Sequence, residues 1–273
     1  MKATVYNIDG TKLKEINLPS QFNETYHPDL IRRAVLAIQS NKRQPYGAYI
    51  EAGERASAKL SRRRRDFKTS YGHGISRASR KTLWRRGTQF GWVGAFTPGT
   101  VSGRRAHPPK AWKVWEQKIN IKEKRKAICS ALAATLNKEL IISRGHILPD
   151  NYPLIIESKL EALEKTKEAK QFLEKIGLKK ELQRVERRTV RSGRGKLRGR
   201  KYRSKIGPLI LVSGKCSLLK SARNIPGVDV VDIKNVNAEL LAPGAMAGRL
   251  TLFTDKAIEL LGKNNLFNNK GAE

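Results

Sequence analysis

Apolar residues recur along this chain in two periods, and each period predicts one class of secondary structure. Residues 4–8 alternate, Asp9-Gly10 can form a tight turn, and residues 12–18 alternate again, which predicts a β-hairpin. Pro28 suits the first turn of a helix that ends by Gln44-Pro45, because a residue before proline is pushed out of the α region. The apolar face of this helix consists of Leu30, Ile31, Ala34, Val35 and Ile38.

The middle of the chain alternates predicted helices with one short apolar run. Helical periodicity resumes at Ile119, and residues 154–156 follow a Pro149-Asp150 turn as a buried strand. Residues 160–176 predict a second amphipathic helix that Gly177 ends as a C-terminal cap. The apolar positions are Ile128, Ala131, Leu132 and Leu136 in the first helix, and Leu160, Leu163, Phe172, Leu173 and Ile176 in the second.

The C-terminal part predicts three more strands, over residues 209–212, 228–233 and 250–253. A short helix over residues 237–241 lies between the last two strands. Thr254 has the side chain of an N-cap for a final helix that ends at Gly262.

Short, continuous apolar strands that alternate with helices are typical of a mostly parallel sheet covered on both faces. The sequence therefore predicts one three-layer α/β domain with a mostly parallel central sheet flanked by helices. Residues 1–44 and 114–265 would form this domain, with a long non-globular basic arm, residues 45–113, inserted near its N-terminal end. Residues 266–273 would form a flexible tail.

The composition of residues 45–113 indicates a segment that is ordered by a partner. Its 69 residues contain 16 Lys and Arg against three acids, nine glycines, nine of the 18 aromatic residues of the chain, and only six aliphatic side chains. So few buried methyl groups cannot offset an ordering cost of roughly 1–2 kcal/mol per residue. The partner must be anionic and must offer flat faces for stacking, which favours structured RNA.

Positive charge is concentrated in two segments. The formal net charge is +32, of which residues 45–113 carry +13 and residues 187–205, with ten basic residues and no acid, carry +10. Such focused charge is typical of phosphate binding. In Arg62–Arg65, the alternating side chains of an extended chain would bridge two phosphate tracks, although a solvated charge run or a localisation signal stays open.

Aromatic residues complete the predicted RNA-binding set. The rings of the arm would stack on unpaired bases, with a small satellite core around Phe90, Trp92 and Phe96 as the alternative. Residues 187–205 would clamp phosphate closely, with a disordered basic linker as the alternative. The predicted RNA-binding residues are Arg55, Lys59, Arg62, Arg63, Arg64, Arg65, Lys68, Tyr71, Trp84, Arg85, Arg86, Phe90, Trp92, Phe96, Arg104, Arg105, Lys110, Trp112, Arg191, Arg194, Lys196, Arg198, Arg200, Lys201, Tyr202 and Arg203.

Catalytic chemistry has no support in the sequence. The four histidines are far apart, and no cofactor, metal or small-molecule motif is present. The run Leu209–Cys216 has the outline of a P-loop but lacks its first glycine and its magnesium-binding hydroxyl. Cys129 and Cys216 stand alone; one disulfide stays open, but a reduced compartment is favoured. The lack of a signal peptide or of roughly 20 successive apolar residues predicts a soluble, intracellular protein without a membrane partner.

Three motifs in order carry a resemblance to a known family. They are SYGHGISRASRKTLWRRG with GAFTPGTVSGRRAHPPKAWKVWEQKIN (70–87 and 94–120), RSGRGKLRGRKYRSK (191–205) and LLAPGAMAGRLTLFTDKAIELLG (240–262). Together they resemble the universal tunnel-lining family of large ribosomal subunit protein four, in its archaeal and eukaryotic branch. The resemblance extends from Val5 to Gly262.

The resemblance implies a structural protein of the large ribosomal subunit in the cytoplasm. It implies primary binding of large-subunit (23S-type) ribosomal RNA early in assembly, and neighbouring ribosomal proteins as partners. It also implies that the tip of the arm lines the nascent-peptide exit tunnel and meets the nascent polypeptide. The implied tip residues are Ile75, Ser76, Arg77, Ala78, Ser79, Arg80, Lys81, Thr82 and Leu83, with Arg77, Arg80 and Lys81 nearest the lumen. An extra-ribosomal regulator that binds nucleic acid is the alternative function.

Overall fold

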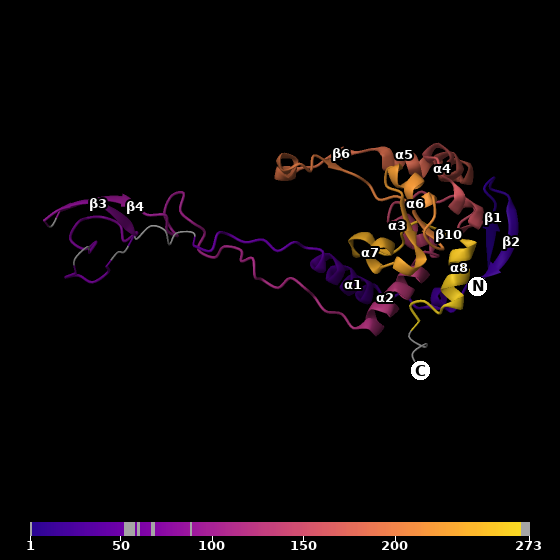
Figure 1. Cartoon of the computed structure of the whole chain (residues 1–273), viewed down its shortest axis with the longest axis horizontal. Coiled ribbons are helices and arrows are strands. Elements are labelled where there is room, and N and C mark those ends of the chain that lie inside the picture. The colour runs from indigo at the N-terminus through magenta and orange to yellow at the C-terminus, as the bar shows by residue number, and fades with distance from the viewer. Residues whose placement is uncertain (1, 52–57, 59–60, 67–68, 88, 269–273) are drawn as a thin grey trace. The chain divides into compact units, whose positions relative to one another are not determined.

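A six-stranded sheet in the order β2-β1-β5-β10-β8-β9 is central to the fold (Figure 1). The computed structural model describes residues 2–51, 58, 61–66, 69–87 and 89–268. The strands are β1 (Lys2–Tyr6), β2 (Lys12–Asn17), β3 (Arg80–Arg86), β4 (Gln89–Gly94), β5 (Leu154–Ile156), β6 (Thr189–Val190), β7 (Tyr202–Arg203), β8 (Leu209–Val212), β9 (Asp229–Asp232) and β10 (Thr251–Thr254). The helices are α1 (Pro28–Asn41), α2 (Ile121–Ala134), α3 (Lys138–Ser143), α4 (Thr166–Leu173), α5 (Lys179–Glu186), α6 (Leu218–Ser221), α7 (Ala238–Leu241) and α8 (Asp255–Lys263).

The sheet is parallel except at one edge. β1 and β2 form the predicted antiparallel hairpin, and β1 then pairs with β5 in parallel through Val5 and Ile155. The pairs β5–β10, β10–β8 and β8–β9 are parallel as well. The predicted mostly parallel α/β sheet is therefore confirmed.

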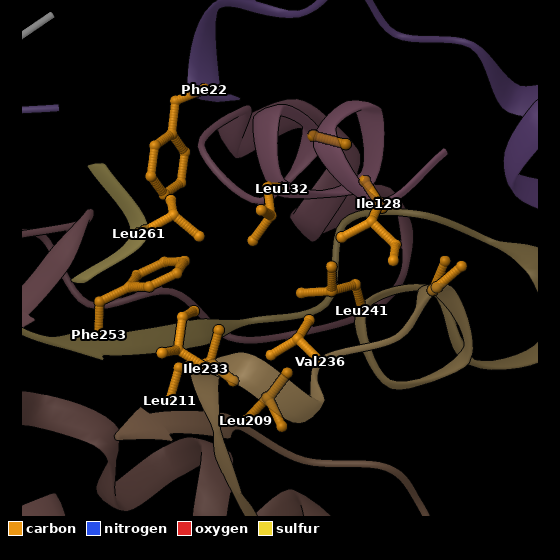
Figure 2. Packing of buried hydrophobic residues seen from close by; sticks show 14 of the residues in the cluster. Phe22, Ile128, Leu132, Leu209, Leu211, Ile233, Val236, Leu241, Phe253 and Leu261 are labelled. Carbon is orange, nitrogen blue, oxygen red and sulfur yellow. The ribbon is translucent and has the colours of Figure 1, made fainter. Parts of the chain in front are cut away.

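Successive strand residues face opposite layers, and the inner strands β5, β8 and β10 are buried on both faces. On one face Val5, Ile155, Leu211 and Phe253 pack against α1, α2, α7 and α8. Figure 2 shows Phe253 beside Phe22 and Leu261, and the two phenyl rings meet edge to face with centroids 5.4 Å apart. This layer begins with α1, whose predicted apolar face is buried at Ile31, Ala34 and Val35.

The alternate strand residues face the second helical layer. Leu154, Ile156, Ile210, Val212 and Leu252 pack there against α4, α5 and α6. All four residues of β8 and of β10 are buried. The continuous apolar pattern of β8 therefore follows from coverage on both faces rather than on one.

One predicted element is wrong in extent. The segment from Leu160 to Ile176 is not a single helix, because a short 3₁₀ turn over Ser158–Ala162 precedes α4, which begins only at Thr166. The side chain of Glu161 in that turn accepts hydrogen bonds from Ser213 and Thr254, and these tertiary contacts fix a non-α backbone. Gly177 does adopt a positive φ of 95°, but the chain then continues directly into α5.

Other boundaries follow the local chemistry of the chain. α1 ends at Asn41, ahead of the predicted stop at Gln44-Pro45. The predicted N-cap at Thr254 is confirmed, since its Oγ1 accepts a hydrogen bond from the N–H of Ala257. The predicted disulfide alternative is wrong, because Cys129 and Cys216 are both free thiols.

The chain divides into two units by its internal contacts. The α/β unit consists of Met1–Asn41 and Glu116–Glu273, and the inserted unit consists of Lys42–Trp115. Within the described residues of the inserted unit, β3 and β4 form an antiparallel hairpin. No described helix is both long and apolar enough to cross a bilayer.

Candidate nucleic-acid interface

The β3–β4 hairpin presents basic side chains on a defined backbone. Arg80, Lys81, Arg85 and Arg86 all lie on β3, with Thr82, Leu83 and Trp84, three strand-favouring residues, between them. Trp84 lies opposite Gly91, and a side chain on Gly91 would collide with the Trp84 indole. Glycine at this position therefore leaves room for the tryptophan ring.

The rings of the hairpin are partly committed to one another. Phe90 and Trp92 stack with centroids 5.4 Å apart, and His73 meets Trp92 edge to face at 5.9 Å. Phe96 and Trp84 remain exposed, by 47% and 55%. The satellite cluster considered as an alternative thus forms around Phe90 and Trp92, whereas the exposed rings keep a face for a partner.

The predicted tip is stabilised by its own arginine. The Arg80 guanidinium donates to the carbonyl oxygens of Ser76 (2.6 Å) and Ala78 (3.1 Å) and to the Ser76 hydroxyl. Arg77 lies over the Tyr71 ring at 5.0 Å. Arg80 is therefore a half-buried brace of the loop, while Arg77, Lys81 and Leu83 are exposed.

The four successive arginines lie on a turn rather than on an extended strand. The N–H of Asp66 donates to the carbonyl of Arg63, and that of Thr69 donates to the carbonyl of Asp66. Arg62–Arg65 are all exposed. The extended backbone expected for Arg62–Arg65 is thus wrong, because a turn spreads the four guanidinium groups around a bend. Their contact with phosphates stays a prediction.

The two ends of the inserted unit are joined by a backbone contact and a ring stack. The N–H of Ala48 donates to the carbonyl of Pro109 at 2.9 Å. Tyr46 stacks on Trp115 with an interplanar angle of 10°, and the Arg43 guanidinium lies 3.6 Å from the centroid of the Trp115 ring. Arg43 and Trp115 were not predicted; the available signal was the pair of tryptophans in the run Trp112–Trp115.

The second basic segment forms a ribbon, defined as residues 187–205. β6 pairs with β7 in antiparallel register, and a 3₁₀ turn over Gly193–Arg198 joins them. Figure 1 shows this ribbon beyond the end of α5. Its ten basic side chains are all exposed, and the ribbon itself contains no acid, so its surface is strongly positive. The β6–β7 pairing and the 3₁₀ turn give this segment defined secondary structure, unlike the disordered linker considered as the alternative.

A buried ionic network fixes the base of the ribbon. The Glu181 carboxylate accepts from Arg184 (2.6 and 2.8 Å), from the N–H of Ile147 (3.0 Å) and from His146 (2.7 Å). Arg184 also donates to the carbonyl of Ile206, just after the ribbon. Burial alone would raise the pKa of Glu181, but these hydrogen bonds and the nearby His146 outweigh it and lower the pKa to about 2.

Most predicted RNA-binding residues lie in the described chain, and most are exposed. Arg55, Lys59 and Lys68 lie outside the described residues. Arg104, Phe90 and Trp92 are half-buried. The exposed ones are Arg62, Arg63, Arg64, Arg65, Tyr71, Trp84, Arg85, Arg86, Phe96, Arg105, Lys110, Trp112, Arg191, Arg194, Lys196, Arg198, Arg200, Lys201, Tyr202 and Arg203.

The loop with the outline of a P-loop is occupied by a carboxylate. Glu161 accepts from the N–H of Ser213 at 2.8 Å and from its hydroxyl at 2.6 Å. A bound phosphate would have to displace this negative charge. Within the described residues, no group of three or more His, Cys, Asp and Glu side chains could hold a metal ion.

Known proteins resemble this chain along nearly its whole length. A sequence model of the ribosomal protein L4/L1 family matches residues 16–264. The chain is 50% identical to the large ribosomal subunit protein uL4 of Nanoarchaeum equitans, over 98% of this chain and all of that protein. It is 43% identical to the same protein of Archaeoglobus fulgidus (96% and 99% covered) and 44% identical to that of Methanocaldococcus jannaschii (96% and 98% covered).

Proposed function

Since the chain belongs to the ribosomal protein L4/L1 family, a family of structural ribosomal proteins and not of enzymes, we propose that its exposed cations and rings bind large-subunit ribosomal RNA. The resemblance predicted from the three sequence motifs is confirmed, in its archaeal form. The chain is a protein of the large ribosomal subunit and acts in the cytoplasm as part of the ribosome.

The ribbon is the observation that carries the proposal. Its ten exposed cations, on a paired backbone that itself contains no acid, suit a polyanion better than a protein surface, where charges of both signs mix. Exposed Trp84, Phe96 and Tyr202 add faces on which bases stack.

RNA is favoured over DNA by the secondary structure of the inserted unit. Readers of the DNA major groove commonly present a helix. The described residues of Lys42–Trp115 contain strands, turns and irregular backbone instead. Such a segment follows the irregular grooves and unpaired bases of folded RNA.

The family implies two further roles, which belong to the same proposal. The inserted unit acts as the arm that joins RNA segments early in assembly of the subunit. The loop at Ile75–Leu83 lines the exit tunnel beside the nascent polypeptide, with Arg77 and Lys81 as exposed cations that Arg80 helps to position. The faces of the α/β unit then remain for neighbouring ribosomal proteins.

Sedimentation and binding experiments test the RNA-binding role. After a high-salt wash of cell extract, the chain is expected to co-sediment with large subunits, and the purified chain is expected to bind large-subunit RNA in preference to small-subunit RNA. Recovery in light fractions, or equal binding to DNA, would support the extra-ribosomal regulator instead.

A crosslinking experiment tests the tunnel role separately. A photoreactive amino acid in place of Leu83, which is 66% exposed, is expected to crosslink to a nascent chain on stalled ribosomes. The matched control carries the same group in place of Leu197 on the ribbon, which is 88% exposed. Equal crosslinking at both positions, or none at Leu83, would contradict the tunnel-lining role.

A further inference from the structure

A pocket of about 510 Å³ lies within the inserted unit, where its two ends meet. Its lining includes Tyr46, Arg105, Lys110, Trp112, Lys113 and Trp115. This volume falls within the roughly 300–1,000 Å³ of typical small-ligand sites. We propose that the pocket holds one unpaired nucleobase of the RNA on Trp112, with the adjoining phosphates on the surrounding cations. The inference rests on the proposed RNA-binding function and specifies one site within it.

The walls of the pocket are held by the chain itself. Besides the hydrogen bond from Ala48 to Pro109, the N–H of Lys113 donates to the carbonyl of Lys110 at 3.2 Å. A Cβ on Gly47 would collide with the backbone of Ala111, so glycine permits the two segments to cross at this distance. The site is thus preorganised, which lowers the entropy cost of binding.

The two tryptophans of the pocket differ in what covers them. Trp115 is half-buried and stacks on Tyr46. The Arg43 guanidinium and the Lys113 ammonium lie 3.6 and 4.5 Å from the centroid of its ring. Trp112 is 62% exposed, and the Lys110 ammonium lies 5.4 Å from the centroid of its ring. Trp115 therefore supports the wall, whereas Trp112 offers an open aromatic face.

The positive charge around the exposed Trp112 ring favours an anionic ligand. Arg105, Lys110 and Lys113 line the pocket together with His107, and no Asp or Glu is among its lining residues. An apolar ligand would leave these cations uncompensated. A nucleotide supplies both a flat π-face for Trp112 and a phosphate for the lysines. A base paired within a duplex is stacked on both sides, so the ligand must be an unpaired one.

The test measures binding of the full chain to large-subunit RNA as a function of salt. Trp112→Ala is expected to weaken binding by roughly 5- to 100-fold while the slope of log affinity against log salt stays constant, because stacking displaces no counterions. Trp112→Phe should keep most of the affinity. Lys110→Ala with Lys113→Ala should instead flatten the slope by roughly 1.4 units for single-stranded phosphates.

Ultraviolet crosslinking locates the ligand directly. A nucleotide adduct is expected on the tryptic peptide Ala111–Lys113 and should map to one unpaired base of the RNA. Unchanged affinity of Trp112→Ala, or an adduct at a paired base, would overturn the inference while leaving the proposed function intact. If the unaltered chain shows no preference for large-subunit RNA, the proposed function fails and this inference fails with it.

Discussion

Glu181 Oε1 lies 2.7 Å from His146 Nδ1, and both side chains are buried in the α/β unit. The same carboxylate pairs with Arg184, which donates to the carbonyl of Ile206 just after the ribbon. A charged network in the core thus connects α5 to the segment that carries ten exposed cations. Removal of either carboxylate oxygen would leave buried donors unpaired.

Glu181 makes stability depend on acid. Its folded-state pKa of about 2 lies below the ordinary value of 4.5, so its contribution is complete above about pH 5 and is lost as the pH falls towards 2. We expect this contribution to be about 3 kcal/mol. The stability difference between the unaltered chain and Glu181→Gln, measured by urea unfolding, should therefore shrink from pH 5 to pH 2. If the two unfolding free energies fall in parallel from pH 5 to pH 2, Glu181 does not cause the acid dependence. Glu186→Gln, an exposed substitution on the same helix, is the control.

Arg249 is the largest polar side chain in the core of the α/β unit, and it is 1% exposed. It donates to the carbonyls of Gly207 and Leu240 and pairs with Asp229. Asp229→Ala leaves a buried guanidinium without its counterion, so we expect a loss of about 2–4 kcal/mol in unfolding free energy.

The double variant Asp229→Ala with Arg249→Met tests the origin of that loss. It should be less destabilised than the sum of the two single variants, because the unpaired buried charge is gone. Additive losses would show that the two side chains act independently. Asp150→Ala, in an exposed turn, supplies the control for removal of a carboxylate.

The ribbon predicts a steep dependence of RNA binding on salt. If about ten cations of the chain contact phosphate, the slope of log affinity against log salt should be roughly −7 to −9. Replacing Arg194, Lys196 and Arg198 with alanine should flatten it by roughly 2–3 units, and thermal unfolding should not change because all three are exposed. A slope near −2 for the unaltered chain would contradict extensive phosphate contact.

Gly47→Ala tests the crossing of the two segments of the inserted unit. Its Cβ would collide with Ala111, so the backbone must shift and the indole N–H resonances of Trp112 and Trp115 should move. The resonances of Trp84 and Trp92, on the hairpin, should stay in place and serve as internal controls. Identical spectra would show that the crossing accommodates a methyl group.

Deletion of Tyr71–Arg86 tests the independence of the α/β unit. The deletion removes β3 and the predicted tip, but none of the residues that form the two apolar cores. We expect the thermal midpoint to change by no more than about 2–4 °C. A larger loss in calorimetry would show that the inserted unit stabilises the α/β unit.

The sheet and its helices were largely predictable, because the apolar period of each segment is readable locally and the apolar positions are the ones that the fold buries. Residues 209–212 and 250–253 read as doubly covered strands, and the packing of both helical layers explains that pattern. The break between Leu160 and Thr166 was not predictable, because it depends on Glu161 contacting Ser213 and Thr254 far along the chain. No local pattern encodes such a bond.

The candidate interface was predictable in composition but not in geometry. Focused charge identified the ribbon, yet its β6–β7 pairing rests on only two residues per strand, too short for an alternation signal. The stacking of Phe90 on Trp92 and the support of Trp115 by Arg43 depend on the fold of the segment. Composition alone included Trp112 in the predicted set. Its separate role as the open ring of a pocket could be inferred only from the residues that surround it.

The parallel pairing of β1 with β5 sets an order of events during synthesis. Val5 can pair with Ile155 only after 150 more residues have been synthesised, and this synthesis takes about 7–30 s at 5–20 residues per second. All of Lys42–Trp115 emerges within that interval, before the central strand that joins β1 to the rest of the sheet exists. The nascent protein therefore carries its cationic segment into the crowded cell before its own body can close. RNA can therefore bind this segment while the rest of the chain is still being translated.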